Sequence, residues 1–412
     1  MTGPLWTSLP AGWRTGQMKN AATVTLGKML QSAASGNDVS APYMRAANVQ
    51  PDGVLALDDV KRMWFDSAEL ERLSIRGGDV VVVEGGQGGF GRAAYVRKDL
   101  SGWGFQNSIN RLRPKRDVDG RFLGYYLIAL RASGFIHAYA NVVSMPHLTA
   151  DKLERVPVPL PPAEMQRAIA DYLDRETDRI DTLIEEQQRL IGMLRERRRA
   201  VIEWGVADIV ADQAALRYVA RLVSGSGFPV DAQGSADEEL PFFKVKDLQS
   251  ANLSGILVAA ADTVSRETAT TLRAAVIPGG SLVFAKVGAA LMLGRVGALP
   301  VDGCIDNNMS ALIFDPAVDP HFARYLMLTF GFARSVQPGA VPSLNMEAVR
   351  EFKIPLISRD HQRSIVEHLD GQTAKIDGLI VETERFIELS RERRSALITA
   401  AVTGQIDVRE VA

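Results

Sequence analysis

The chain has 412 residues, of which 46% are hydrophobic and 23% charged, and its formal net charge is −2. This length exceeds one ordinary hydrophobic core and predicts two or more domains, while the composition excludes disorder over the whole chain. The single cysteine, Cys304, excludes a disulfide framework and argues against a cysteine zinc site. The first residues lack a signal-peptide pattern, and Lys286 and Arg295 interrupt the most apolar stretch. We therefore expect a cytoplasmic protein with no membrane span.

The first globular part, residues 1–158, reads as α+β, with a strand at 79–84 followed by the loop GGQGGFG. This loop contains G-x-G-x-x-G, which in a dinucleotide site opens a helix and precedes an acidic residue about 20 positions on. Here a second strand, RAAYV, follows, and Arg111 stands 20 positions after Gly91. The pattern favours a glycine loop between strands over a phosphate site.

The next segment, residues 159–206, opens with PLPP and continues as a helix, because proline is tolerated in the first turn. Alternating steps of four and three residues describe a seam that packs against another helix. The seam positions are Ile180, Ile184, Gln187, Ile191, Leu194, Arg198 and Val201.

This helical segment is repeated. PLPPAEMQRAIADYLDRETDRIDTLIEEQQRLIGMLRERRRAVIEWGV, from Pro159, aligns without gaps with PLISRDHQRSIVEHLDGQTAKIDGLIVETERFIELSRERRSALITAAV, from Pro355. The offset is 196, and 22 of 48 positions are identical, including RERR in both copies. The second seam is Ile376, Ile380, Thr383, Ile387, Ser390, Arg394 and Leu397. Chain order requires the two helices to run antiparallel if their seams pair, related by a pseudo-two-fold axis.

The second globular part, residues 207–354, is a weaker copy of the first, with a matching strand at 281–285. Its net charge is −3, against +5 for residues 1–158. A protein that grips DNA alone is usually basic, so this balance argues against an autonomous strong DNA binder. The five histidines are scattered, and the sequence contains no Walker, zincin or serine-hydrolase motif.

The order of globular part, P-L-P-P-x-x-x-Q-R helix, globular part and P-L-x-x-x-x-x-Q-R helix resembles the specificity subunit of type I restriction–modification systems. The motifs that carry the resemblance are PVPLPPAEMQRAIADYLDRETDRIDTLI, KIPLISRDHQRSIVEHLDGQTAKIDGLI, the two RERR ends, AVPSLNMEAVREFKIPL, VSGSGFP and VEGGQGGFGRAAYV. The second copy departs from the pattern by replacing PLPP with PLIS, which we expect to change only the helix entry.

The resemblance implies an α+β protein with two target-recognition domains separated by a pair of long antiparallel coiled-coil helices. Recognition domains then occupy residues 1–158 and 207–354, and spacer helices occupy 159–206 and 355–412. It further implies a non-catalytic subunit without metal or cofactor that reads a split target in double-stranded DNA. Two methyltransferase subunits and restriction subunits are the implied partners. The chain agrees in lacking adenine-methyltransferase N-P-P-[YF] or D-P-P-[YF] motifs.

Side chains that can read purine edges or hold phosphates occur at matched loop positions of both globular parts. We predict DNA contacts at Arg45, Asn48, Gln87, Arg92, His147, Lys244, Lys246, Asp247, Lys286, Ser343 and Asn345. Two other functions remain open at this stage. One is a coiled-coil repeat scaffold for protein assembly without DNA reading, and the other is a nucleotide-dependent enzyme that uses GGQGGFG.

Overall fold

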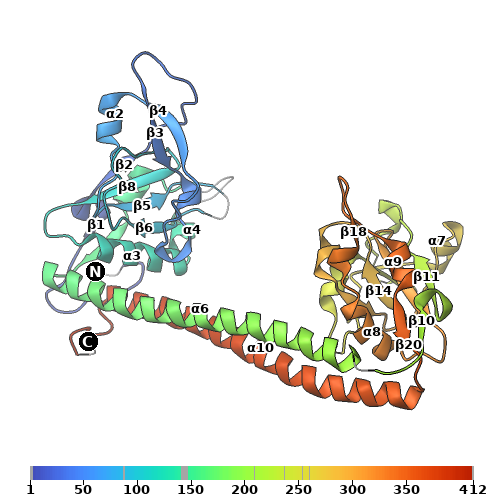
Figure 1. Cartoon of the computed structure of the whole chain (residues 1–412). Helices are drawn as coiled ribbons and strands as arrows, with labels where there is room; N and C mark the ends of the chain where they lie inside the picture. The colour runs from blue at the N-terminus through green and yellow to red at the C-terminus, as the bar shows by residue number, and fades with distance from the viewer. Residues whose placement is uncertain are drawn as a thin grey trace. The chain divides into compact units, whose positions relative to one another are not determined.

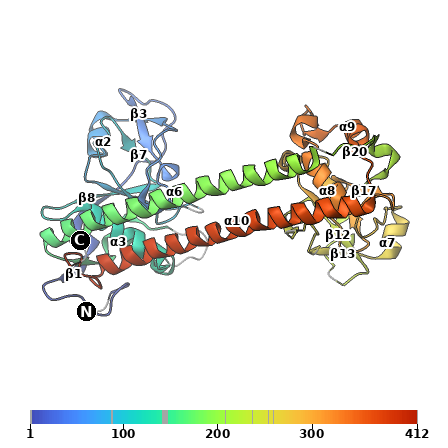
Figure 2. The ribbon, with the colours of Figure 1, turned by 60° about the horizontal axis from the view of Figure 1, so that its bottom comes forward.

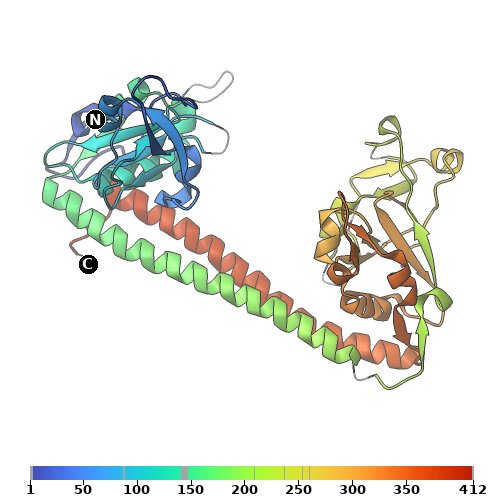
Figure 3. The same cartoon turned by 45° about the horizontal axis from the view of Figure 1, so that its top comes forward.

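The computed structural model describes residues 3–86, 89–140, 147–207, 209–235, 237–252, 254–258 and 260–410. The chain forms two compact units, of which unit 1 is Met1–Glu186 with Phe386–Ala412 and unit 2 is Gln187–Arg385. Each unit contains one α+β domain and one part of each of two long helices (Figure 1). The first described residues of the chain and its last ones, from Phe386 onward, both belong to unit 1 (Figure 3).

The domain of unit 1 is built on a four-stranded antiparallel sheet in the order β2-β8-β5-β6. Its strands are β2 (Ala22–Leu26), β8 (Ile109–Pro114), β5 (Val80–Val83) and β6 (Ala93–Tyr95). A smaller sheet, β4-β3-β7, consists of β4 (Lys61–Phe65), β3 (Val39–Met44) and β7 (Gly104–Phe105), and β1 (Arg14–Gln17) pairs with β9 (Pro157–Leu160). The helices are α1 (Met18–Ala21), α2 (Ser67–Arg72), α3 (Gly120–Ala132), α4 (Phe135–Tyr139) and α5 (Ala150–Glu154).

Unit 2 repeats the two sheets and the strand pair of unit 1 in the same order. Its four-stranded sheet is β11-β17-β14-β15, from β11 (Ala220–Ser224), β17 (Met309–Phe314), β14 (Leu282–Ala285) and β15 (Val296–Ala298). The smaller sheet is β13 (Asp262–Val264), β12 (Leu240–Phe243) and β16 (Cys304–Ile305), and two strand pairs join β10 (Gln213–Ala215) to β20 (Lys353–Pro355) and β18 (Val336–Gln337) to β19 (Ser343–Leu344). The helices are α7 (Arg266–Thr271), α8 (Pro320–Thr329) and α9 (Met346–Glu351). The internal repeat therefore includes the domains, where sequence similarity is weak.

The central strand of each domain is apolar on both faces because it lies between two hydrophobic cores. Val80 and Val82 of β5 face a core shared with α3, while Val81 and Val83 face a core shared with the smaller sheet. Figure 1 shows α3 between the large sheet and the long helices of unit 1. A run such as VVVV is typical of a strand buried on both sides. Because β5 pairs antiparallel with β6, the glycine loop leads into a second strand and not into a helix.

The two long helices are α6 (Ala163–Ala207) and α10 (Arg359–Val402), and within each unit they pack together in opposite directions (Figure 2). In unit 2, Arg195 lies by Glu384 and Arg198 by Asp377, so numbers rise along α6 as they fall along α10. No described helix is long and apolar enough to cross a membrane.

Most predicted seam positions are buried, among them Ile180, Ile184, Ile191, Leu194, Ile376 and Ile387. Ile380 is half-buried. Near the C-terminal end of each helix the buried position shifts by one residue: Ile202 and Ile398 are buried, whereas the predicted Val201 and Leu397 are half-buried. An α-helix drifts relative to a 3.5-residue repeat, and these ends pack against the domains as well as against the other helix.

The arginine at the end of each RERR motif makes the same cross-helix ion pair in both units. Arg394 of α10 donates from Nε and Nη2 to the two carboxylate oxygens of Asp181 at 2.9 and 3.0 Å. Arg198 of α6 donates from Nε to Asp377 at 2.7 Å. These pairs are related by the offset of 196 residues, so the arginine of each seam is paired with a carboxylate of the other helix.

A glutamine at the start of each long helix, Gln166 or Gln362, hydrogen-bonds the adjoining domain, and we call this interaction the latch. In unit 1 the Gln166 carboxamide accepts from the backbone N–H of Asp119 at 3.0 Å and donates to the Pro161 carbonyl at 2.9 Å. In unit 2, Gln362 accepts from the N–H of Asp319 at 2.7 Å and donates to the carbonyl of Ile357 at 2.9 Å. The glutamine of the Q-R motif thus bonds the backbone at a helix start in the domain.

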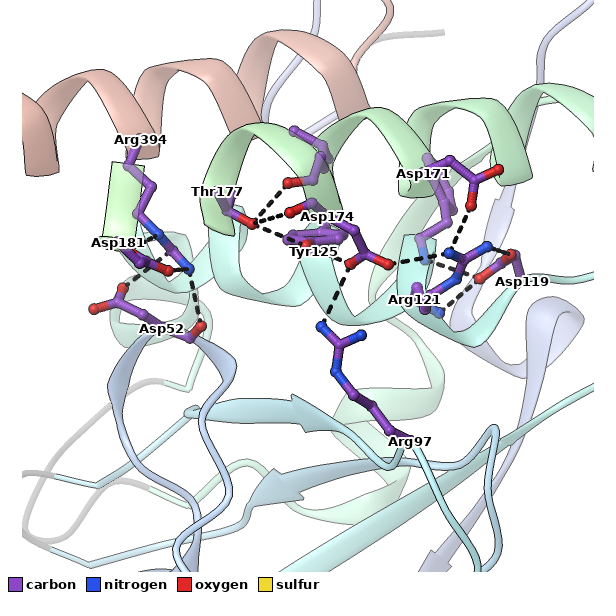
Figure 4. Close-up of polar contacts among 12 residues, drawn as sticks. Asp52, Arg97, Asp119, Arg121, Tyr125, Asp171, Asp174, Thr177, Asp181 and Arg394 are labelled. Carbon is purple, nitrogen blue, oxygen red and sulfur yellow. Dashed lines mark hydrogen bonds and ion pairs between the residues drawn. The ribbon is translucent and has the colours of Figure 1, made fainter. Parts of the chain in front are cut away.

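Next along the interface between α3 and α6 in unit 1 is a group of hydrogen-bonded charged side chains (Figure 4). Arg121 donates to Asp119, Asp171 and Asp174 at 3.0, 2.7 and 3.1 Å. The Tyr125 hydroxyl donates to Asp174 at 2.8 Å, and burial raises the pKa of this phenol. Tyr325 and Asp370 make the same bond in unit 2.

Candidate nucleic-acid interface

Four loop segments of unit 1 meet at one edge of the domain, where β5 ends. The N–H of Ala46, next to Arg45, donates to Ser108 Oγ at 3.3 Å, and the N–H of Glu84 donates to the Ser108 carbonyl at 2.8 Å. The N–H of Leu148 donates to the Glu84 carbonyl at 2.7 Å, which brings His147 to the same edge. Backbone hydrogen bonds therefore assemble the predicted residues Arg45 and His147, although they are about a hundred positions apart in the chain.

Unit 2 gathers the equivalent segments through equivalent bonds. The N–H of Asp306 donates to the Phe243 carbonyl at 2.9 Å, and the N–H of Lys286 donates to the Asn308 carbonyl at 2.8 Å. The N–H of Leu344 in turn donates to the Lys286 carbonyl at 2.8 Å. The predicted residues Lys244, Lys286 and Ser343 therefore converge on one edge of this domain.

The other predicted residues at these edges differ in their exposure and in their partners. The imidazole Nδ1 of His147 lies 3.1 Å from Glu84 Oε2, and its side chain is half exposed. Arg45 pairs with Asp59. In unit 2, Lys244 pairs with Asp262 at 2.7 Å, and Lys246 is exposed.

Lys286 directly follows β14 and Arg92 directly precedes β6, and both side chains are half-buried. Burial lowers the pKa of the Lys286 ammonium, and the carboxylate of Asp306 opposes this change. Arg92 follows Gly91, whose φ of +71° is a conformation that favours glycine. The Arg92 Nε is buried without a hydrogen-bond partner among the described residues. The predicted Gln87 lies outside the described residues.

Three predicted residues are capping residues of the loops. Asn48 is buried, accepts from the N–H of Arg45 at 2.9 Å and donates to the Ala56 carbonyl at 2.8 Å. Asp247 accepts from the N–H of Lys244 at 2.7 Å in the equivalent turn of unit 2. Asn345 caps α9 by accepting from two backbone N–H groups. These side chains shape the loops that carry their neighbours.

Sequence reasoning missed two amides at the edge of unit 2. Asn307 and Asn308 are exposed in the turn between β16 and β17, next to Lys286. Carboxamides bond adenine well because they donate and accept side by side. The signal was the alignment of GFQNSIN with CIDNNMS, which places amides at matched turns of both halves.

Not every basic residue of unit 1 is free to meet DNA. Arg111 is buried in β8 and donates to the carbonyls of Arg72 and Ser74, and burial lowers its pKa to about 10. Arg113 pairs with the buried Asp79 at 2.8 Å. Among the residues that the structure describes, no group of three or more His, Cys, Asp or Glu side chains is placed to hold a metal ion.

Known proteins match this arrangement in sequence and in fold. Residues 10–191 match the family model described as the type I restriction modification DNA specificity domain. A structure from a study of complex assembly and conformational transition of the type I R-M system aligns with a TM-score of 0.75 at 17% identity, over 97% of this chain and 100% of its own. The HsdS subunit from Thermoanaerobacter tengcongensis aligns with a TM-score of 0.53 at 17% identity, over 98% of this chain and 100% of its own. At these identities the two structures establish the fold. No curated protein sequence gives a significant match.

The family model covers the first domain and the start of the first long helix, and the second half of the chain repeats both. Residues 10–191 therefore match the type I restriction modification DNA specificity domain, and the whole chain shares the fold of the two solved structures.

Proposed function

We propose that the chain is a DNA specificity subunit of a type I restriction–modification system and that it reads a bipartite DNA target, with one recognition domain for each half-site. The observation that carries the proposal is a duplicated fold whose two loop edges hold different side chains. We assign recognition to residues 1–158 and 207–354, and spacing to residues 159–206 and 355–412. Two similar domains on a repeated helix pair suit two half-sites separated by unread base pairs.

The two half-sites differ in sequence because the two edges differ in chemistry. Arg45 and His147 occupy the edge of the first domain, while Lys246, Lys286 and Asn308 occupy that of the second. Guanidinium groups favour guanine, and carboxamides favour adenine. The charges of the domains, +5 and −3, also predict that they contribute unequally to phosphate binding.

We further propose that two copies of a methyltransferase subunit dock on the helix pair and that restriction subunits join this complex. Leu190 and Met193 of α6 are 36% and 59% exposed, and their repeat equivalents on α10, Phe386 and Leu389, are 43% and 53% exposed. Exposed apolar side chains that recur with the repeat suit a partner that binds twice through the same surface.

This docking hypothesis predicts a change in stoichiometry. Met193→Asp lowers the number of bound methyltransferase subunits from two to one in native mass spectrometry, and Leu389→Asp does the same. Val381→Asp is the control, because Val381 is also 59% exposed but its repeat equivalent is Glu185. Retention of two subunits by both single variants would remove these residues from the interface.

The subunit itself is proposed to be non-catalytic and to act in the cytoplasm. Because its net charge is −2, the chain alone binds DNA weakly. Partner subunits supply the other contacts to the DNA phosphates. Methylome sequencing of a strain with and without the gene tests the function as a whole. We expect one split methylated motif to disappear on deletion, and an unchanged methylome would favour a scaffold without DNA reading.

A further inference from the structure

A cavity of about 240 Å³ in unit 1 is unusually rich in arginine. It lies beside α3 and α10, and Arg92 from the loop before β6 completes it. Its charged lining residues are Arg92, Arg131, Arg391, Arg394 and Asp52. Four guanidinium groups therefore face one carboxylate.

Only one of these arginines is neutralised by ion pairs. Arg394 is 7% exposed and binds Asp181, and it also lies 3.6 Å from Asp52 (Figure 4). Arg92, Arg131 and Arg391 form no ion pair with any carboxylate in the described parts of the chain. The cavity therefore holds an excess of positive charge.

The excess charge is partly removed from water. The Arg131 Nε donates to the Phe90 carbonyl at 3.0 Å, and the Arg92 Nε is buried with no partner among the described residues. Burial lowers the pKa of the Arg131 guanidinium, the charge of Arg92 lowers it further, and Asp52 offsets part of this effect. Half-buried like charges destabilise each other unless an anion lies between them.

The internal repeat provides a natural comparison in unit 2. There a cavity of about 400 Å³ is lined by Arg195, Arg198, Arg199, Arg334 and Glu203. Three of these arginines already have carboxylate partners, because Arg195 binds Glu384, Arg198 binds Asp377 and Arg199 binds Glu203.

The sequence explains why the two cavities differ. At the offset of 196, the repeat equivalents of Glu384 and Glu203 are Gln188 and Thr399. In the second RERR motif Arg394 keeps its carboxylate partner Asp181, but Arg391 lacks the partner that Arg195 has in Glu384 and remains free to bind another anion.

We propose that the arginine cavity of unit 1 binds a phosphate group of the DNA backbone beside the first half-site. This assignment rests on the proposed function, because DNA is the phosphate-bearing ligand of a specificity subunit. Guanidinium groups suit phosphate because they donate two parallel hydrogen bonds to its oxygens. The contact positions the DNA backbone without reading a base. The equivalent cavity of unit 2 does not provide this contact, because three of its four arginines are already paired with carboxylates.

The test compares repeat-equivalent arginines in the full chain. Binding of a duplex containing the target is measured between 50 and 200 mM NaCl for the wild type, Arg391→Gln and Arg195→Gln. Each phosphate contact contributes about 0.9 to the slope of log affinity against log salt. Raising the salt from 50 to 200 mM weakens DNA binding of both proteins. The factor by which binding of Arg391→Gln weakens is roughly three- to fourfold smaller than the factor for the wild type. Arg195→Gln keeps the wild-type slope because Arg195 is already paired, and Arg391→Lys keeps it because the charge is retained.

Arg391 is exposed on α10, so these substitutions leave the fold intact, which circular dichroism verifies. An Arg391→Gln slope equal to that of the wild type overturns the proposal, provided that the wild type prefers its target. If the wild type shows no preference for any duplex, the proposed function fails instead.

Inorganic phosphate is the second arm, measured by calorimetry with ionic strength held constant. We expect phosphate to bind the wild type and Arg195→Gln more tightly than Arg391→Gln. Phosphate binding that depends on Arg391, together with an unchanged DNA slope, would identify a free-anion site and refute the assignment to DNA.

Discussion

Replacing Ile184 by aspartate tests whether the helix seam stabilises unit 1. Ile184 is 9% exposed on α6, so the substitution removes a buried apolar side chain and places a carboxylate among apolar neighbours. Loss of the isoleucine packing alone costs about 2–5 kcal/mol in a well-packed core, and a buried unpaired charge typically costs about 3–5 kcal/mol. Because the seam is only two helices thick, we expect about 3–5 kcal/mol in total.

This cost corresponds to a large change in melting temperature. For a folded unit of 150–250 residues, one kcal/mol shifts the midpoint by about 2–4 °C. The expected decrease is therefore about 6–20 °C, measured by circular dichroism on the full chain. Met193→Asp is the matched control on the same helix, because Met193 is 59% exposed and its substitution should change the midpoint by less than about 2 °C. Equal melting temperatures for Ile184→Asp and the wild type would refute the packing of this seam.

Three further predictions follow from the repeat and the edges. Gln166→Ala removes both hydrogen bonds of the unit 1 latch and should cost about 1–3 kcal/mol, measured by urea unfolding against a control at an exposed position of the same helix. A fragment of residues 1–210 should form a two-fold dimer by light scattering, because Asp181 of one copy faces Arg198 of the other. Asp181→Arg should make this fragment monomeric, and combining it with Arg198→Asp should restore the dimer; a monomeric wild-type fragment would contradict the pairing. Arg45→Ala should relax specificity by about 1–3 kcal/mol in one half of the target only, read by methylation sequencing, and relaxation of both halves would argue against one domain per half-site.

Repetition and periodicity were visible in the sequence because they are local properties. The gapless match of the helical segments and their three- and four-residue spacing predicted two long helices and their antiparallel pairing. The strand VVVV and the following RAAYV favoured a loop between strands over a nucleotide loop, and the sheet of unit 1 confirms that these segments are neighbouring antiparallel strands. Near the end of α6 the buried position is Ile202 and not the predicted Val201, because this end of the helix also packs against the domain.

The sequence by itself therefore determined the architecture, since an internal repeat and a hydrophobic period do not depend on distant contacts. Tertiary structure alone decided which polar residues are available to a ligand. Asn48 looked like a base-reading amide, but folding buries it as a cap, while Asn308 was brought to the edge by a backbone bond with Lys286. Likewise, RERR is the same string twice, yet Arg195 has a carboxylate partner and Arg391 has none among the described residues. Whether a charged side chain is neutralised depends on residues hundreds of positions away, and only the folded chain places them beside it.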